Sequence, residues 1–286
     1  MASSRVTVIC LCYNQERFVR EAIESVLSQT YTDVQLIVVD DASSDGSVQV
    51  IESCVRLHPQ IKFVKLLTNS GNCKAFNRGL EHAEGDFIID LAADDVLLPD
   101  RVSRGVEALT RAGDLFGVNY TDAEWISEEG GHLRFHSDHF PHHSVPEGNV
   151  YKALVERFFI CSPTMMFRRT VIDQLGGYDE ELAYEDFDFW IRSSRDFLYC
   201  YTPAALVKKR VVKGSMSQRQ FSFFSPQLRS TYRVCEKILA LNRDRQEQRA
   251  LAKRILYEMS VCVKLLDLRL ALRYTWLYLK NARMQY

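Results

Sequence analysis

Short apolar runs alternate with stretches of helical periodicity in the N-terminal part of the chain. The runs are rich in β-branched residues, which is typical of buried strands. Between them apolar residues recur at helical spacing, as Phe18, Ala22 and Val26 do. This alternation predicts an α/β fold in which a mostly parallel sheet is flanked by helices. The four predicted strands are residues 6–12, 34–39, 61–67 and 87–93.

The regular alternation ends after one further predicted helix, which begins past Pro99 and runs to Ala112. Residues 130–148 are rich in Gly, His and Pro, and we expect them to form a long loop. From about residue 219 onward apolar side chains again recur at helical spacing, which predicts a helical C-terminal region. Shorter strands are expected near residues 117–120, 165–168 and 204–211.

Charge divides the chain into two parts. The formal net charge of the 286 residues is −1, yet residues 213–286 contain fifteen Lys or Arg against five Asp or Glu. Residues 1–212 therefore carry a compensating excess of acidic side chains. We expect the acidic part and the basic part to have different tasks. The length is sufficient for one large domain, or for one domain with an appendage.

The cysteine pattern and the hydropathy favour a cytoplasmic protein. The eight cysteines form no C-x-x-C pair, and a chain of this size does not need disulfides, so a reducing compartment is expected. No apolar stretch is long enough for a transmembrane helix, and the N-terminus does not resemble a signal peptide. No nucleic-acid reader motif accompanies the basic charge, so nucleic acid is not an expected partner.

Two pairs of aspartates directly follow predicted strands. Asp40 and Asp41 come at the end of the second strand, and Asp94 and Asp95 at the end of the fourth. Because open α/β folds bind ligands at the carboxyl ends of their strands, these carboxylates predict a nucleotide site. Adjacent carboxylates also suit Mg²⁺ or Mn²⁺, which bind substrate phosphates. The structural alternatives are a helix N-cap for Asp95 and an Asx turn for Asp41.

The first predicted strand is followed by Tyr13 and Asn14, at the same edge of the sheet. An aromatic ring there can pack on a planar base, although a Tyr-Asn turn without a ligand explains the pair nearly as well. The strand is not followed by a glycine-rich loop. Sugar-1-phosphate nucleotidyltransferases and dehydrogenases need such a loop, so both classes are disfavoured.

Six consecutive segments resemble the signatures of family-2 glycosyltransferases. Three of them are VVDDASSDGS at residues 38–47, EGDFIIDLAADDVLLPD at residues 84–100 and GGYDEELAYED at residues 176–186. The resemblance implies a GT-A-type, Rossmann-like fold and an inverting transfer of a sugar from a nucleotide sugar. The other three segments are residues 6–14, 22–31 and 69–79.

The resemblance also implies how the chain is divided. Residues 1–217 would form the GT-A domain, with a nucleotide-binding half at about residues 1–115 and an acceptor-binding half at residues 116–217. Residues 218–286 would be a basic amphipathic helical extension. Its mixture of cations and apolar side chains suits an anionic membrane surface, while packing on the catalytic domain or in a homodimer is the alternative. The mixture consists of Arg269, Arg273, Lys280 and Arg283 with Leu268, Leu272, Trp276 and Leu279.

By the same resemblance, the two acid pairs have separate roles. Asp41 would contact the uracil or the ribose, and Asp94 and Asp95 would contact ribose and metal as the family's D-x-D-type element. The divalent ion, Mn²⁺ or Mg²⁺, is assigned to Asp95 together with Asp94. The remaining residues assigned to the nucleotide sugar are Leu11, Tyr13, Asn14 and Lys74. For Lys74, a solvated surface lysine is an equally good reading.

The resemblance places the catalytic base in the segment Tyr184-Glu185-Asp186. A carboxylate must take the proton of the acceptor hydroxyl, and we assign this role to Asp186, with Glu185 as the alternative. An acidic residue at a helix start is the structural explanation for either. The chain departs from the family where Val212 stands in place of a usual histidine, which leaves the third metal ligand open.

The sequence therefore predicts a metal-dependent glycosyltransferase that transfers a sugar, from a UDP-sugar in our assignment, to a glycan or lipid-linked acceptor of a surface polysaccharide. Peripheral attachment to the inner face of the cytoplasmic membrane is part of this prediction. The alternative is a non-catalytic member of the fold that binds nucleotide sugars or a membrane complex. A histidine cluster at residues 132–143 is read as an acceptor-facing loop, an inert surface or a zinc site.

Overall fold

The chain forms two compact units in the computed structural model, which describes residues 4–140, 145–213 and 225–284. The predicted boundary between residues 217 and 218 falls outside these described ranges. The first unit consists of Met1–Gly148, Ile160–Glu180 and Phe197–Val212, and the second of Asn149–Phe159, Glu181–Asp196 and Lys213–Tyr286.

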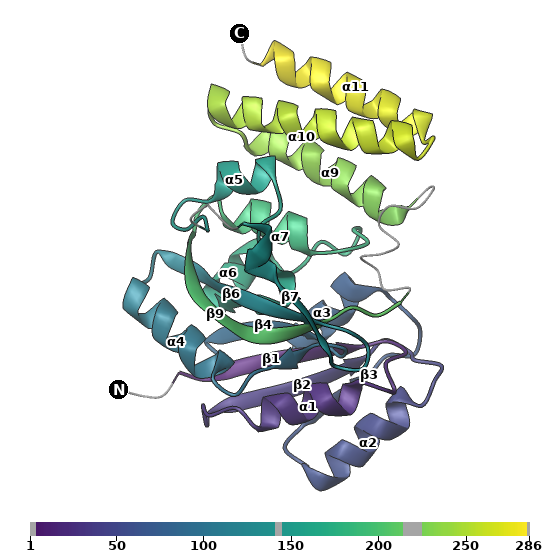
Figure 1. Cartoon of the computed structure of the whole chain (residues 1–286), viewed down its shortest axis with the longest axis vertical. Helices are drawn as coiled ribbons and strands as arrows, with labels where there is room; N and C mark the ends of the chain where they lie inside the picture. The colour runs from purple at the N-terminus through teal and green to yellow at the C-terminus, as the bar shows by residue number, and fades with distance from the viewer. Residues whose placement is uncertain (1–3, 141–144, 214–224, 285–286) are drawn as a thin grey trace. The chain divides into compact units, whose positions relative to one another are not determined.

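The first unit is built on one sheet that is flanked by helices (Figure 1). The strand order of the sheet is β3-β2-β1-β4-β8-β6-β9-β5, and β7 pairs with β6. The predicted parallel arrangement is confirmed in its first half, because β1 pairs in parallel with β2 and β4, and β2 with β3. The four strands of this half are β1 (Val6–Cys12), β2 (Val34–Asp40), β3 (Lys62–Lys65) and β4 (Phe87–Ala92).

The second half of the sheet is mixed. Strand β8 runs antiparallel to both β4 and β6, whereas β6 and β9 are parallel to each other. The strands expected near residues 117–120 and 204–211 are both much longer than predicted. The strands of this half are β5 (Val96–Leu97), β6 (Phe116–Ile126), β7 (His132–Phe135), β8 (Met166–Arg168) and β9 (Leu198–Arg210).

The long loop expected at residues 130–148 is partly structured, so that prediction was wrong in its first part. Strand β7 pairs there with β6, and the 3-10 turn η1 (His136–His139) follows it. The Gly and His content concealed a short hairpin, because hairpin pairing needs only a turn and a neighbouring strand. Residues 141–144 lie outside the described part of the chain.

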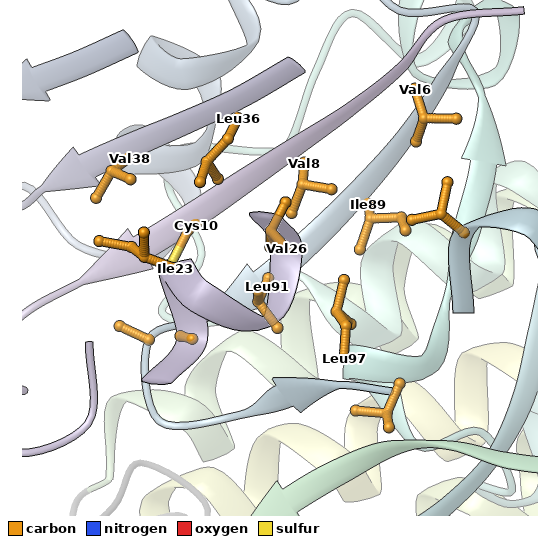
Figure 2. Packing of buried hydrophobic residues seen from close by; sticks show 14 of the residues in the cluster. Val6, Val8, Cys10, Ile23, Val26, Leu36, Val38, Ile89, Leu91 and Leu97 are labelled. Carbon is orange, nitrogen blue, oxygen red and sulfur yellow. The ribbon is translucent and has the colours of Figure 1, made fainter. Parts of the chain in front are cut away.

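The side chains of β1 point alternately to the two faces of the sheet, and helices cover both faces. Val6, Val8, Cys10 and Cys12 belong to an apolar core that packs against α1, α2 and α4 (Figure 2). These helices bury one apolar face each, as their periodicity predicted. The helices of this unit are α1 (Val19–Leu27), α2 (Ser47–Leu57), α3 (Asn72–Leu80), α4 (Arg101–Ala112) and α6 (Arg169–Leu175), with the 3-10 turn η2 (Ser162–Thr164).

Helix α3 covers the opposite face of β1 and β2, and a glycine sets how closely it approaches. A Cβ atom on Gly79 would lie 2.5 Å from Cγ2 of Ile9 and 3.0 Å from Cγ2 of Val39. No side chain fits into such a gap without displacing the strands. The glycine near the C-terminal end of α3 therefore lets this helix pack closely on β1 and β2.

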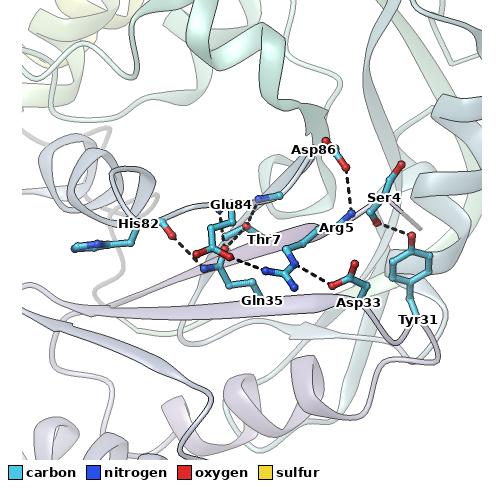
Figure 3. Close-up of polar contacts among 10 residues, drawn as sticks. Ser4, Arg5, Thr7, Tyr31, Asp33, Gln35, His82, Glu84 and Asp86 are labelled. Atoms are coloured by element: carbon cyan, nitrogen blue, oxygen red, sulfur yellow. Dashed lines mark hydrogen bonds and ion pairs between the residues drawn. The ribbon is translucent and has the colours of Figure 1, made fainter. Parts of the chain in front are cut away.

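A polar network closes the opposite edge of the sheet, where the strands begin (Figure 3). Arg5 pairs through Nε with Asp33 at 2.9 Å and through Nη1 with Glu84 at 2.6 Å. The hydroxyl of Thr7 donates to Oε1 of Gln35 at 2.6 Å. These bonds link β1 to the segments before β2 and β4, so the amino ends of the strands are held in register.

The second unit is helical apart from its connecting segments. Its three C-terminal helices begin with Ser225, Asp244 and Asp267, whose side chains accept backbone N–H bonds as N-caps. Among the described residues, no helix is long and apolar enough to cross a membrane. The helices are α5 (Tyr151–Glu156), α7 (Asp186–Ser193), α9 (Pro226–Leu241), α10 (Arg245–Lys264) and α11 (Leu268–Arg283).

A buried arginine ties the inner helices of this unit together. Arg254 of α10 donates through Nε to the carbonyl oxygen of Val155 in α5 at 3.0 Å and pairs with Glu258 at 3.2 Å. Its guanidinium lies 4.3 Å from the ring centre of Phe158 and 5.1 Å from that of Phe187. The residues around α7 are thus anchored to the C-terminal helices.

Candidate active site

The carboxyl ends of β1, β2 and β4 lie next to one another at one edge of the sheet, as the sequence predicts. Cys12 lies opposite Asp40 in the β1–β2 ladder, and Leu11 lies opposite Ala92 in the β1–β4 ladder. The backbone continues these pairings past the strands, since Asp41 N donates to the carbonyl oxygen of Cys12 at 2.9 Å. The two acid pairs therefore flank the end of β1 within the first unit.

Asp41 is buried and holds the loop that leads into α3. Its Oδ1 accepts hydrogen bonds from the backbone N–H and the hydroxyl of Ser70, at 2.7 and 2.9 Å, and its Oδ2 accepts one from the N–H of Gly71 at 2.9 Å. The turn after β2 is instead held by Asp40, whose Oδ2 accepts a hydrogen bond from the N–H of Ser43 at 3.0 Å. The other Asp40 oxygen is buried with no partner in the described chain.

Asn14 and the loop after β2 are bound to each other. Its N–H donates to the hydroxyl of Ser43 at 2.9 Å, and its side-chain oxygen accepts from the N–H of Ser44 at 2.8 Å. Asn14 and Ala42 both have left-handed backbone conformations, with φ of 54° and 59°. Tyr13, beside them, has 48% of its surface exposed. This arrangement is a rigid, polar loop pair that leaves one aromatic ring accessible.

Asp94, which is half-buried, and Asp95, which is buried, form an acidic pair one residue after the end of β4. Burial and the neighbouring charge of Asp94 raise the pKa of Asp95 to about 8, and burial also raises the pKa of Asp94. The helix-cap explanation for Asp95 is wrong, because β5 follows the pair and the N-cap residue of α4 is Asp100. Without a cation, the two adjacent carboxylates repel each other when both are ionised.

Arg210, at the end of β9, holds this pair, and the sequence did not single it out as a site residue. Its backbone N–H donates to Oδ1 of Asp95 at 2.9 Å, and its Nε donates to the carbonyl oxygen of Asp94 at 3.1 Å. Nη2 pairs with Glu21 of α1 at 2.5 Å. The signal in the sequence was an arginine near the end of a predicted strand, but its partners are distant along the chain.

The acid pair fits a divalent ion with oxygen ligands. Carboxylates whose pKa is raised by burial and mutual repulsion gain most when a cation neutralises them. Mg²⁺ and similar ions are commonly held by one or two carboxylates together with substrate phosphates. Within the described ranges, no group of three or more His, Cys, Asp or Glu residues is arranged to hold a metal.

The Gly-Gly-Tyr-Asp segment docks onto α3 next to the strand ends. Asn77 of α3 accepts from the N–H of Tyr178 at 2.9 Å and donates to its carbonyl oxygen at 2.9 Å. The Tyr178 hydroxyl donates to Oδ2 of Asp90 in β4 at 3.1 Å, and its ring stacks on Phe76. The sequence analysis did not assign Asn77 or Asp90 a role. Lys74 lies exposed on the first turn of α3.

Asp186 and Glu185 belong to the second unit. Glu185 is the residue preceding α7, and Asp186 is its first residue. One carboxylate oxygen of Asp186, Oδ1, is buried and accepts no hydrogen bond from the residues that the structure describes. By contrast, Asp188 is neutralised by Arg192 at 2.6 Å and Lys237 at 2.5 Å. Asp188 therefore has a structural role, whereas Oδ1 of Asp186 accepts no hydrogen bond from the described residues.

The described histidines of the cluster form an aromatic group on the β6–β7 hairpin. The rings of His136 and His139 lie about Trp125, with centroid separations of 6.2 and 6.1 Å. His132 Nδ1 lies 2.9 Å from Oε1 of Glu124. The described part of the cluster holds no three-ligand metal group, and His142 and His143 lie outside the described residues.

A family model now accounts for most of the first unit. The model described as glycosyl transferase family 2 matches residues 7–176, which include β1, both acid pairs and α6. The chain belongs to glycosyl transferase family 2. It is therefore a glycosyltransferase, as the resemblance in its motifs predicted.

Two curated relatives are also named as glycosyltransferases. The chain is 29% identical over 241 residues to the putative glycosyltransferase EpsE of Bacillus subtilis, a match covering 82% of this chain and 83% of EpsE. It is 28% identical over 217 residues to the putative teichuronic acid biosynthesis glycosyltransferase TuaG of Bacillus subtilis, covering 76% of this chain and 82% of TuaG.

Solved structures of glycosyltransferases share the fold. The S. aureus TarS fragment in complex with UDP-GlcNAc superposes with a TM-score of 0.70 at 18% identity, covering 97% of this chain and 79% of the fragment. The mannosyltransferase PcManGT of Pyrobaculum calidifontis, in complex with GDP-Man and Mn²⁺, gives 0.65 at 19% identity, covering 100% of this chain and 87% of PcManGT. The predicted GT-A-type α/β fold with C-terminal helices is confirmed.

Proposed function

We propose that this family-2 glycosyltransferase is metal-dependent and inverting, and that it transfers a sugar from a UDP-sugar to a surface polysaccharide or to its lipid-linked precursor. The observation that carries the proposal is the convergence of Asp41 and the Asp94–Asp95 pair around the end of β1. The UDP-GlcNAc complex of TarS and the Mn²⁺ complex of PcManGT support the donor and metal classes, and the name of TuaG supports the product class.

On this proposal the first unit binds the donor. The exposed ring of Tyr13 would pack on the base, while Asp41 and Asn14 would contact the nucleoside from their fixed loops. Leu11 would line the floor of this site, because it lies next to the carboxyl end of β1. Lys74, on the first turn of α3, would approach the phosphates. A divalent ion held by Asp95 and Asp94 would supply positive charge that stabilises the leaving diphosphate.

The second unit would supply the proton acceptor. The acceptor hydroxyl oxygen attacks C1 of the sugar, the bond from C1 to the diphosphate oxygen breaks, and the nucleoside diphosphate leaves with the electron pair. The hydroxyl proton passes to Asp186, whose Oδ1 has no hydrogen-bond donor among the described residues. Glu185 is the alternative base. Attack from the face opposite the leaving group inverts the configuration at C1.

The donor assignment is tested by thermal unfolding. UDP with Mn²⁺ should raise the melting temperature by several degrees at saturating concentration, because a ligand that binds only the native state stabilises it. UDP with a chelator should give a much smaller shift. Asp95→Ala should abolish the metal-dependent part of the shift.

Asp114→Ala is the matched control, because Asp114 is a fully exposed aspartate of the same unit. It should preserve the response to UDP and Mn²⁺. Absence of a shift in the wild-type protein with any nucleoside diphosphate and either metal would contradict the proposed function. An equal loss in both variants would contradict the role of Asp95.

We further propose that α11 contacts an anionic membrane surface. Leu268, Leu272, Trp276 and Leu279 recur on one face of this helix, and each has more than half of its surface exposed. The flanking cations favour anionic headgroups, since apolar and basic side chains together bind such interfaces. A cytoplasmic location at the inner face of the membrane stays part of the proposal.

Co-sedimentation with vesicles tests this surface. The protein should bind vesicles that contain phosphatidylglycerol more strongly than neutral ones, and Leu272→Ser should weaken that binding. Leu67→Ser is the control, because Leu67 is a leucine of the first unit that is even more exposed than Leu272. Concentration-dependent dimerisation that Leu272→Ser removes, without vesicle binding, would assign the face to a second copy instead.

A further inference from the structure

Helix α9 binds the segment that precedes α7 through two neighbouring hydroxyl groups. The backbone N–H of Ala183 donates to Oγ of Ser230 at 2.8 Å. The hydroxyl of the next residue, Tyr184, is hydrogen-bonded to Oγ1 of Thr231 at 2.7 Å. Ser230 and Thr231 are buried residues of α9, and both bonds lie within the second unit. Two consecutive residues of the segment are thus bound to two consecutive residues of one helix.

The direction of the bond between Tyr184 and Thr231 follows from the other contact of the threonine. The hydroxyl of Thr231 donates to the carbonyl oxygen of Gln227, one turn earlier in α9, at 3.0 Å. Because a threonine hydroxyl carries one proton, the phenol of Tyr184 is the donor in the bond to Thr231. Burial raises the pKa of Tyr184, so the phenol keeps this proton. Thr231 therefore presents a fixed acceptor oxygen to Tyr184.

A third contact with α9 lies on the other side of Asp186. Nζ of Lys237 is 2.5 Å from Oδ1 of Asp188, whose side chain is almost completely buried. Asp186 thus stands between two anchored residues, Tyr184 and Asp188, each two positions away. A shift of the Asp186 backbone would disturb at least one of these contacts.

The three contacts leave the carboxylate of Asp186 uninvolved. Its Oδ1 is buried and accepts no hydrogen bond from the residues that the structure describes. An oxygen that takes a proton from a substrate needs a lone pair for that proton, and its position must be fixed by other groups. The bonds from α9 meet both needs, because they hold the chain on either side of Asp186 and use none of its atoms.

We propose that Ser230 and Thr231 are positioning residues, which hold the start of α7 so that the carboxylate of Asp186 can accept the proton of the acceptor hydroxyl. The inference rests on the proposed function, because it takes Asp186 as the base. It goes further in making α9 a requirement for proton transfer, although this helix lies outside the residues 7–176 that the family model matches.

The kinetics of donor turnover by the full chain test this role. UDP release from UDP-glucose, UDP-galactose and UDP-GlcNAc with Mn²⁺, with water in place of the acceptor, measures the rate. Ser230→Ala/Thr231→Val removes both hydroxyls and should lower kcat by about tenfold or more, because displacing a catalytic group by about 1 Å can cost about 10²-fold. The affinity for UDP with Mn²⁺ should be unchanged, since the proposed donor residues belong to the first unit.

Two further variants serve as controls. Thr231→Ser keeps the acceptor oxygen and should retain most of the activity. Thr275→Val is the matched control on α11, because the hydroxyl of Thr275 donates to the carbonyl oxygen of Ala271 at 3.0 Å as that of Thr231 does to Gln227. It should keep kcat. Equal losses in Thr275→Val and Ser230→Ala/Thr231→Val would contradict the proposal.

A double-mutant cycle with Asp186→Asn separates positioning from a general loss of stability. If the two hydroxyls act through Asp186, Ser230→Ala/Thr231→Val should cause little further loss of rate in the Asp186→Asn background. A further tenfold loss in that background would overturn the proposal. So would an unchanged kcat of the double variant beside a slow Asp186→Asn, which leaves the base assignment standing. An Asp186→Asn variant as fast as the wild type would instead refute the proposed base, and positioning with it.

Hydrogen–deuterium exchange gives a readout that does not depend on activity. Amides of residues 183–188 should exchange faster in Ser230→Ala/Thr231→Val, because the N–H of Ala183 loses its acceptor and the segment loses its anchor. Thr275→Val should leave their exchange unchanged. Unchanged exchange in the double variant contradicts the proposal. A wild type that releases no UDP from any of the three donors contradicts the proposed function, whereas faster exchange in the double variant still supports anchoring by α9.

Discussion

At the scale of single residues, the decisive feature is how the chain keeps two adjacent carboxylates largely away from water. Loss of hydration raises the pKa of both Asp94 and Asp95, and the charge of Asp94 raises that of Asp95 further. Arg210 donates its backbone N–H to Oδ1 of Asp95 and its Nε–H to the backbone carbonyl oxygen of Asp94. The pair is thus positioned before any ligand binds, at the expense of native-state stability.

The raised pKa of Asp95 predicts that the stability of the protein depends on pH in metal-free buffer. An unfolded aspartate has a pKa of about 3.9, whereas that of native Asp95 is about 8. Between these values the native state retains a proton that the unfolded state has lost, so stability falls as the pH rises. The free energy of unfolding of the wild type relative to Asp95→Asn should therefore decrease from pH 5 to about pH 8, measured by urea unfolding.

Binding of Mn²⁺ should follow the opposite trend. The ion must displace the same proton, so its affinity should increase over the same pH interval. Glu107→Gln is a suitable control, because Glu107 is an exposed acid of α4 and should alter neither trend. A difference between wild type and Asp95→Asn that does not vary with pH would contradict the raised pKa.

At the scale of elements, the site depends on segments that dock onto helix α3. The loop after α6 reaches α3 through Asn77, which bonds to both backbone groups of Tyr178. Gly177 permits this approach, because its φ is +89° and a Cβ there would lie 2.8 Å from Oδ1 of Asn77. Asp41 fixes the other end of α3 through Ser70 and Gly71.

Gly177→Ala should therefore lower the free energy of unfolding by about 1–3 kcal/mol, through backbone strain and the clash with Asn77. Gly176→Ala is the matched control, because Gly176 also has a positive φ, +70°, but has open space at its Cβ. Gly176→Ala should lower the free energy of unfolding by less than Gly177→Ala does. Chemical denaturation of both variants measures the difference. An equal effect of the two substitutions would show that the contact with Asn77 is not what requires glycine.

At the scale of the whole molecule, the proposed donor and base residues belong to different compact units. The second unit gathers Asn149–Phe159 and Glu181–Asp196 with the C-terminal helices, so segments distant in sequence share one core. Arg254 and Asp188 connect these segments to α10 and α9. Donor binding and proton transfer should consequently respond to different substitutions.

Asp186→Asn should reduce the transfer rate by about 10²- to 10⁴-fold, because it removes a general base, and should leave the affinity for UDP with Mn²⁺ unchanged. Initial rates of sugar transfer and UDP titrations measure the two effects. Glu185→Gln should keep most of the activity. The reverse order of the two variants would make Glu185 the base, and equal, negligible rates in wild type and Asp186→Asn would indicate a binding protein.

Local patterns determined the first half of the fold and the positions of the acid pairs. Residues 6–12 and 87–93 read as strands because their burial on both faces requires continuous apolar residues, and the acids after them had to lie at the carboxyl edge. The motif resemblance added the family, which the match over residues 7–176 bears out. Each of these inferences uses neighbours along the chain.

The tertiary structure alone decided which distant residues complete the site. Arg210 reaches Asp94, Asp95 and Glu21 from the end of β9. Ser230 and Thr231 of α9 bind the segment before α7. Periodicity identifies which face of an element is buried, but not which element covers it. Such contacts depend on packing between segments far apart in sequence, so only the folded chain assigned Arg210 to the acid pair.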